Sequence, residues 1–138
     1  MTGTIRRVVT GHDESGRAVV VSDGPAPFVH VTLRNPITGA LPRDLPAQLD
    51  CAADRTLLPE SIAQALALPP IGMIPIGGVG GLVQSMPSYP VEVTIPTLAA
   101  VMVEVVASPG EAWVRLGRDV LNLHRVLLDG PQLALEVG

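Results

Sequence analysis

Short runs that alternate between apolar and polar positions dominate this chain of 138 residues. The clearest is Phe28–Arg34, in which Val, Val and Leu take every second position, the period of a half-buried β-strand. The final segment, Gln132–Val137, alternates in the same way after the turn-forming residues Asp129-Gly130-Pro131. Both segments are predicted to be strands, the second as one arm of a hairpin.

Further segments have strand or helix character. Four more strands are predicted from β-branched and apolar runs: Arg17–Ser22, Ala47–Asp50, Pro90–Ile95 and Ala100–Val106. The breaker-rich residues 23–27 are predicted to separate the first of these from the strand that follows. Helical spacing is confined to Pro59–Leu68, which has Pro at its first position, and to a short segment around Asp119–Leu123. Many short strands with little helix predict an all-β, barrel-like domain.

Composition and charge argue against several classes of function. The formal charge of −4 and the scattered basic residues argue against nucleic-acid binding. A single cysteine, Cys51, excludes an intramolecular disulfide and a multi-cysteine metal site, so neither a metal nor another cofactor is expected. No apolar run reaches the roughly 18 residues of a membrane span, and the first residues lack a secretory apolar stretch. A cytoplasmic protein without a membrane partner is predicted.

The most informative stretch is Asp50–Pro59, where an acid ends an apolar run and is followed by small residues and a second apolar run. It resembles the active-site loop of retropepsin-like aspartic proteases, whose pattern is Asp, Thr or Ser, Gly, Ala, and then a polar residue. Asp50 falls on the catalytic aspartate, and Ala53 and Asp54 complete the loop. Cys51 stands where the family has Thr or Ser, and Ala52 stands where it has Gly.

Two later segments carry the same resemblance, in the family's order. Ile74–Val83 resembles the flap hairpin that closes over the substrate, and its glycines are expected to allow positive φ at the tip. The resemblance implies that these flap residues contact the substrate: Ile76, Gly77, Gly78, Val79, Gly80 and Gly81. Gly117-Arg118-Asp119 resembles the element that opens the family's C-terminal helix. There the resemblance implies that Arg118 pairs with Asp54 and that Gly117 gives structural support.

The resemblance covers residues 27–138, and residues 1–26 are predicted to be an extra N-terminal hairpin. It implies a retropepsin-like acid-protease barrel with a glycine-rich flap hairpin and one or two short helices. The length fits a single domain with its own core.

The implied chemistry needs two facing carboxylates that share a proton and activate one water. The chain has one such loop, so a homodimer is required, in which each subunit contributes Asp50 and cleaves a peptide or protein substrate. The alternative is a catalytically weak or inactive dimer that binds peptides or proteins through the same groove. Asp50 favours the protease. Cys51 and Ala52 favour the alternative, because a thiol is a weaker donor than a hydroxyl and a methyl group crowds the site.

Overall fold

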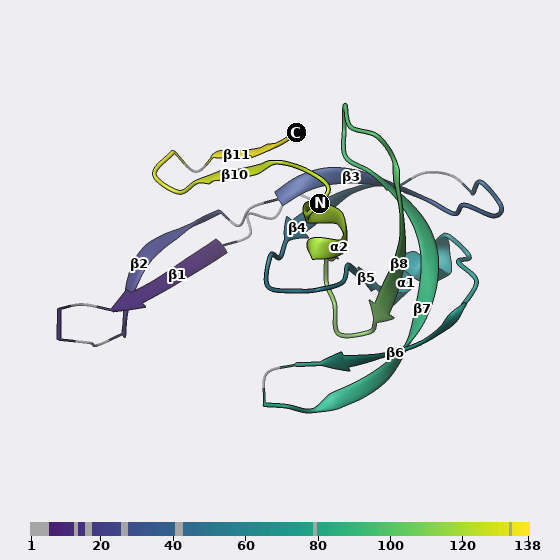
Figure 1. The fold of residues 1–138 in the computed structure, drawn as a ribbon, viewed down its shortest axis with the longest axis horizontal. Helices are drawn as coiled ribbons and strands as arrows, with labels where there is room; N and C mark the ends of the chain where they lie inside the picture. The colour runs from purple at the N-terminus through teal and green to yellow at the C-terminus, as the bar shows by residue number, and fades with distance from the viewer. Residues whose placement is uncertain are drawn as a thin grey trace.

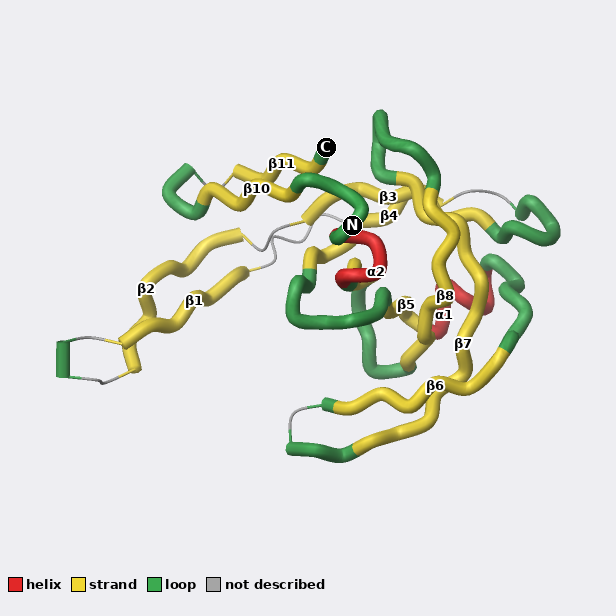
Figure 2. The backbone as a smooth tube through the Cα atoms, in the orientation of Figure 1, coloured by secondary structure: helices red, strands yellow, loops and turns green. Residues whose placement is uncertain are grey.

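The computed structural model describes residues 6–12, 14–15, 18–25, 28–40, 43–78, 80–132 and 134–138. In this part of the chain strands predominate (Figure 2), and the two helices are short. The strands are β1 (Arg6–His12), β2 (Ala18–Pro25), β3 (Phe28–Arg34), β4 (Arg43–Leu49), β5 (Leu57–Pro59), β6 (Gly72–Gly77), β7 (Val83–Thr94), β8 (Val101–Ser108), β9 (Val114–Leu116), β10 (Val126–Asp129) and β11 (Ala134–Val137). The helices are α1 (Glu60–Ala65) and α2 (Arg118–Leu121). Neither is long and apolar enough to cross a membrane.

Six strands close into a barrel in the order β3-β4-β9-β5-β8-β7, because β3 pairs with both β4 and β7. β6 pairs only with β7 and extends the sheet outside the barrel (Figure 1). Two contacts in this barrel are parallel, β4 with β9 and β5 with β8, and the others are antiparallel. This confirms the all-β, barrel-like fold predicted from the sequence.

The core fills the inside of the barrel with aliphatic side chains. The strand period places them, since in β3 the alternate residues Val31 and Leu33 are buried, as predicted. The largest fully buried apolar side chains are Leu33, Leu58, Leu66, Leu116, Val31, Val91, Val93, Val105, Val106, Val114 and Val120. This apolar interior supports the two segments that follow β4 and β9, where the candidate site lies.

The first helix is shorter than the predicted Pro59–Leu68. Pro59 lies before α1 in an extended conformation, and the helix ends at Ala65. Two features beyond local spacing end it there. The buried side-chain amide of Asn35 donates to the carbonyl oxygens of Leu66 (3.0 Å) and Ala67 (3.1 Å), and Ala67 adopts a positive φ. A distant asparagine therefore caps the carbonyl groups that a further helical turn would use.

Other boundaries also differ from the sequence expectation. β2 runs on to Pro25, so residues 23–25 belong to the strand rather than to a separating turn. β7 begins at Val83 instead of Pro90 and runs without interruption from the outer hairpin into the barrel. The short strands β5 and β9 were not predicted, because three residues are too few to show a period.

Two hairpins lie outside the seven-stranded sheet. β1 and β2 form one two-stranded sheet, and β10 and β11 form another. The predicted turn joins β10 to β11, and in it Gln132 N donates to Asp129 Oδ1 at 3.1 Å. Figure 1 shows the β1–β2 hairpin to one side of the barrel and the β10–β11 hairpin beside α2. The division into residues 1–26 and 27–138 stays a prediction.

One ion pair on the barrel gives a pH-dependent stability. Arg34 donates from Nε and Nη2 to the two carboxylate oxygens of Glu92 at 2.9 and 2.8 Å. This hydrogen bonding lowers the pKa of the Glu92 carboxyl. The pair is expected to stabilise the fold at neutral pH. This stabilisation is lost as the pH falls, beginning near the ordinary glutamate pKa of about 4.3 in the unfolded chain and ending below the lowered pKa of Glu92 in the folded protein.

The melting temperature of Glu92→Gln should therefore fall below that of the wild type at pH 7, and the two should converge as the pH falls below about 4.3 and through the lowered pKa of Glu92. Glu14→Gln, which removes an exposed acid from the β1–β2 turn, is the control and should follow the wild type throughout. A difference for Glu92→Gln that is constant across this range would contradict the linkage.

Candidate active site

The barrel positions Asp50 at the point where β4 ends. The parallel pairing of β4 with β9 continues one residue further, because Asp50 N donates to Leu116 O at 2.9 Å. Oδ1 of Asp50 accepts hydrogen bonds from the backbone N–H groups of Ala52 (3.1 Å) and Ala53 (3.2 Å). Oδ2 lies 3.6 Å from Nη1 of Arg115, and the carboxylate side chain is 26% exposed. The loop thus fixes one oxygen and leaves the other accessible.

The rest of the predicted loop lies at the surface. Cys51 is a free, exposed thiol, Ala52 and Asp54 are exposed, and Ala53 is partly buried. Ala52 does not adopt a positive φ, so alanine is not strained at this position where the family has glycine. The expected effect of Ala52 on the site is therefore steric crowding by its methyl group and not backbone strain.

The segment after β9 holds the loop in place. Arg118 donates from its side chain to Asp54, so the two charges paired by sequence reasoning are in contact. The backbone N–H groups of Arg118 and Asp119 donate to the carbonyl oxygens of Ala53 (2.9 Å) and Asp54 (3.3 Å). Three contacts therefore join the start of α2 to the Asp50 loop.

A buried network beneath the loop was missed by sequence reasoning. Thr56 is fully buried, and its hydroxyl donates to Asp119 Oδ1 at 2.7 Å and accepts from Gly117 N at 3.1 Å. Thr56 N donates to Asp119 Oδ2 at 2.9 Å. Gly117 is needed at this close approach, because a Cβ there would lie 2.4 Å from the carbonyl carbon of Arg55. The resemblance had implied structural support from Gly117, but the only sequence signal for Thr56 was a hydrophilic residue directly before an apolar run.

Thr56→Val is expected to destabilise the protein by about 2 kcal/mol, because it leaves Gly117 N–H without its acceptor and removes the hydroxyl donor to Asp119 Oδ1. Urea unfolding measures this. Thr38→Val is the matched control, since the Thr38 hydroxyl accepts only an exposed bond from Ala40 N. Equal losses in the two variants would contradict a structural role for the buried network.

The glycine-rich segment forms the tip of the β6–β7 hairpin. Gly78 N donates to Leu82 O, and Gly81 N donates to Gly78 O, both at 3.2 Å. Gly80 and Gly81 have positive φ values of 92° and 77°, as expected for the tip. The expectation is wrong for Gly77 and Gly78, whose φ is not positive. Val79 lies outside the described residues.

A groove of about 560 Å³ separates the Asp50 loop from the β6–β7 hairpin. Its lining comes from the loop, the hairpin and the segment around β9: Asp50, Ala52, Ala53, Asp54, Arg55, Leu57, Pro75, Ile76, Gly77, Gly78, Glu111 and Arg115. The structure therefore brings the predicted loop together with Ile76, Gly77 and Gly78, whereas Gly80 and Gly81 lie beyond this lining. Arg115 was not predicted, because β9 itself was not, and Glu111, which precedes β9, was not predicted either.

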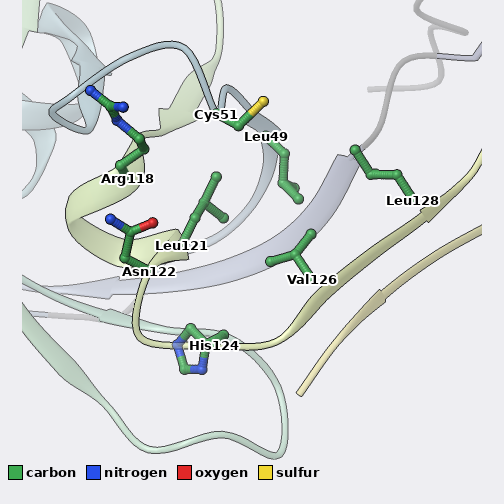
Figure 3. A pocket seen from close by; sticks show the side chains of 8 residues that line it. All are labelled: Leu49, Cys51, Arg118, Leu121, Asn122, His124, Val126 and Leu128. Carbon is green, nitrogen blue, oxygen red and sulfur yellow. The ribbon is translucent and has the colours of Figure 1, made fainter.

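A second hollow, of about 360 Å³, lies on the other side of the loop (Figure 3). Figure 3 shows Leu49 and Cys51 on one side of the hollow and Val126 and Leu128 of β10 on another, with Leu121 of α2 beside Leu49. Arg118, Asn122 and His124 complete the lining. The hollow is mainly apolar. Cys51 lines this hollow and not the groove that Asp50 lines.

No group of three or more His, Cys, Asp or Glu side chains in the described part of the chain is placed to hold a metal ion. Among the described histidines, His30 lies 3.4 Å from Asp44 on the barrel surface, and His124 follows α2. The charged side chains that line the groove are carboxylates and arginines: Asp50, Asp54, Arg55, Glu111 and Arg115.

A closed barrel that presents an aspartate loop below a glycine-tipped hairpin is the architecture of retropepsin-like aspartic proteases, and the chain has this fold. It is similar over 99% of its length to a retropepsin-like aspartic protease from Rickettsia conorii, with 13% identity, a TM-score of 0.54 and 96% of that chain covered. A foamy viral protease-reverse transcriptase in complex with an RNA/DNA hybrid is also similar, with 19% identity and a TM-score of 0.52 over 72% of this chain. The chain spans only 12% of that viral protein's length. The sequence matches no protein-family model and no curated protein.

Proposed function

We propose that this chain is a homodimeric aspartic endopeptidase, with the activity in residues 27–138 and with residues 1–26 as an N-terminal extension. The observation that carries this proposal is the placement of Asp50. Its carboxylate has one oxygen fixed by two loop amides and the other directed at a groove under a hairpin. A preorganised carboxylate in a groove that can hold an extended peptide suits the activation of water for peptide hydrolysis.

The second carboxylate has to come from another copy of the chain. Each chain offers one Asp50 loop, and a two-fold axis beside it would bring two such carboxylates together. Two carboxylates at close range share one proton and titrate as a pair. The unprotonated one would then take a proton from the water, while the protonated one would polarise the scissile carbonyl.

The hollow beside Cys51 supports a second copy as the partner. It is mainly apolar, with Leu49, Leu121, Val126 and Leu128 in its lining, and Leu128 is 47% exposed. Clustered apolar side chains of this kind favour a protein interface. It lies next to the Asp50 loop, as required for a dimer in which the two loops meet.

The β6–β7 hairpin is proposed to act as a flap over the substrate. Its tip residues Gly78, Gly80 and Gly81 have no atom within 4 Å of the place a Cβ would take, so the tip is free to approach a peptide. An extended peptide between this tip and the Asp50 loop would bind largely through main-chain hydrogen bonds. No nucleic acid, membrane or cofactor has a part in this proposal, and the compartment proposed is the cytoplasm.

The exposed Cys51 keeps a second function open, a dimer that binds peptides without cutting them. In the family the hydroxyl at this position is implied to lock the two loops together, and a thiol donates more weakly. Two less firmly locked loops would hold the Asp50 pair less precisely, with a cost in rate.

The test is cleavage of a diverse peptide library between about pH 4 and pH 7 under reducing conditions, by wild type and by Asp50→Asn, with the dimer verified by analytical ultracentrifugation. Asp50-dependent cuts would support the protease. Binding without cuts by a folded dimer would favour the second function. In that case the double variant Cys51→Thr with Ala52→Gly is expected to gain cleavage, and its failure to do so would end the protease proposal.

A further inference from the structure

Arg115 gives the groove an ionic character beside the reactive carboxylate. The geometry points to Arg115 as a specificity-determining residue that selects an acidic side chain next to the scissile bond, an inference that rests on the proposed function. Its guanidinium lies 3.6 Å from Asp50 Oδ2 through Nη1, and it lines the same groove. A substrate residue adjacent to the cut bond would therefore meet a cation rather than an apolar wall.

The position of Arg115 is fixed by the barrel. It is the middle residue of β9, between the buried side chains of Val114 and Leu116, so strand alternation directs it to the opposite face. Its backbone pairs with Gln48 of β4, two residues before Asp50. The charge thus sits on a rigid strand rather than on a mobile loop.

The contacts of Arg115 leave it able to bind another carboxylate. Nη2 lies 3.0 Å from Glu111 Oε2, and the Arg115 and Glu111 side chains are 37% and 18% exposed. The distance to Asp50 is longer than a hydrogen bond. A guanidinium has five N–H donors in a planar fork, and a carboxylate can accept two of them at once. An incoming acidic side chain can therefore share Arg115 with Glu111.

The charge balance of the groove also favours an acid. Asp54 is already paired with Arg118, and Glu111 is paired with Arg115. Arg55 lines the groove as well, and in the described part of the chain no ion pair engages it. Arg55, Arg115 and Arg118 therefore offset the negative charges of Asp50, Asp54 and Glu111, and an acidic substrate residue does not enter a groove of unpaired carboxylates.

The experiment compares peptides that differ at a single residue beside the cut bond, with Glu, Gln, Leu or Arg there, at about pH 6, where a glutamate is ionised. Wild type is expected to cleave the Glu peptide about tenfold faster, in kcat/KM, than the Leu peptide. Arg115→Leu should remove or reverse this preference, and Arg115→Gln, which retains a polar side chain, should weaken it. Glu111→Gln should strengthen it, because it frees the guanidinium from its partner.

Fluorescence anisotropy of the same peptides on Asp50→Asn gives a readout that does not need turnover. Arg34→Leu is the matched control, since it removes an arginine and its ion pair from outside the groove, and it should keep the Glu preference. Equal preference in wild type and both Arg115 variants would overturn the inference even if cleavage occurs. Selective binding of the Glu peptide without cleavage by wild type or by the Cys51→Thr with Ala52→Gly variant would support Arg115 as the selecting residue and overturn the protease. Failure of all peptides to bind or be cut would overturn both.

Discussion

Replacing Asp50 with asparagine is expected to lower peptide cleavage by about a thousandfold, the scale of general acid–base catalysis, and to leave the fold intact. The amide oxygen of asparagine can still accept the hydrogen bonds that Ala52 N and Ala53 N make to Oδ1. The amide cannot exchange a proton with the bound water, and both subunits of the dimer carry the change. The measurement is kcat/KM on the best peptide, with circular dichroism and sedimentation to show an unchanged folded dimer.

Asp44→Asn is the matched control for this comparison. Asp44 lies on β4, the strand that leads into the Asp50 loop, but its side chain is 76% exposed and lies 3.4 Å from His30. It should cleave as fast as the wild type. Residual cleavage by Asp50→Asn at the rate of this control would exclude Asp50 as the catalytic group, because a contaminating protease or another site would then account for the cuts.

The sequence predicted those features that depend on local periodicity. β3 has the predicted bounds Phe28–Arg34, and the β10–β11 hairpin turns at the predicted residues, since alternation and turn chemistry decide both. The end of α1 could not be predicted, because Asn35, thirty-one residues before Leu66, caps it. Local propensity extends the helix, and a tertiary contact stops it.

In the candidate site, too, local sequence motifs predicted some residues, and contacts between distant segments positioned the others. Asp50 and the contact between Asp54 and Arg118 followed from motif resemblance, since each lies in a recognisable stretch. Arg115 had no motif around it. It reaches Asp50 only because a three-residue strand pairs in parallel with β4, and such pairings between distant segments leave no period in the sequence. The specificity of the groove therefore depends on residues that the fold, rather than the motif, brings together.

Gly117→Ala is expected to be the most destabilising single change in the site, by about 3 kcal/mol, with a drop in melting temperature of roughly 10 °C. The added Cβ would lie 2.4 and 2.5 Å from the carbonyl carbon and oxygen of Arg55 and 2.9 Å from Thr56 N. These are backbone atoms, so no side-chain rotation relieves the overlap. The loop has to move away from α2, which breaks the hydrogen bonds of Gly117 N to Thr56 and of Arg118 N to Ala53.

Gly110→Ala separates this steric effect from the general effect of removing a glycine. The nearest atom to a Cβ at Gly110 is Ser108 Oγ at 3.8 Å, an ordinary contact, so this variant should melt within a few degrees of the wild type. If Gly117→Ala folds but cleaves poorly, the contact between β9 and the loop sets the geometry of Asp50. If instead its melting temperature and cleavage rate match those of Gly110→Ala, the loop can shift away from α2 without loss of stability or activity. The network of Thr56, Gly117 and Asp119 then does not fix the geometry of the Asp50 loop.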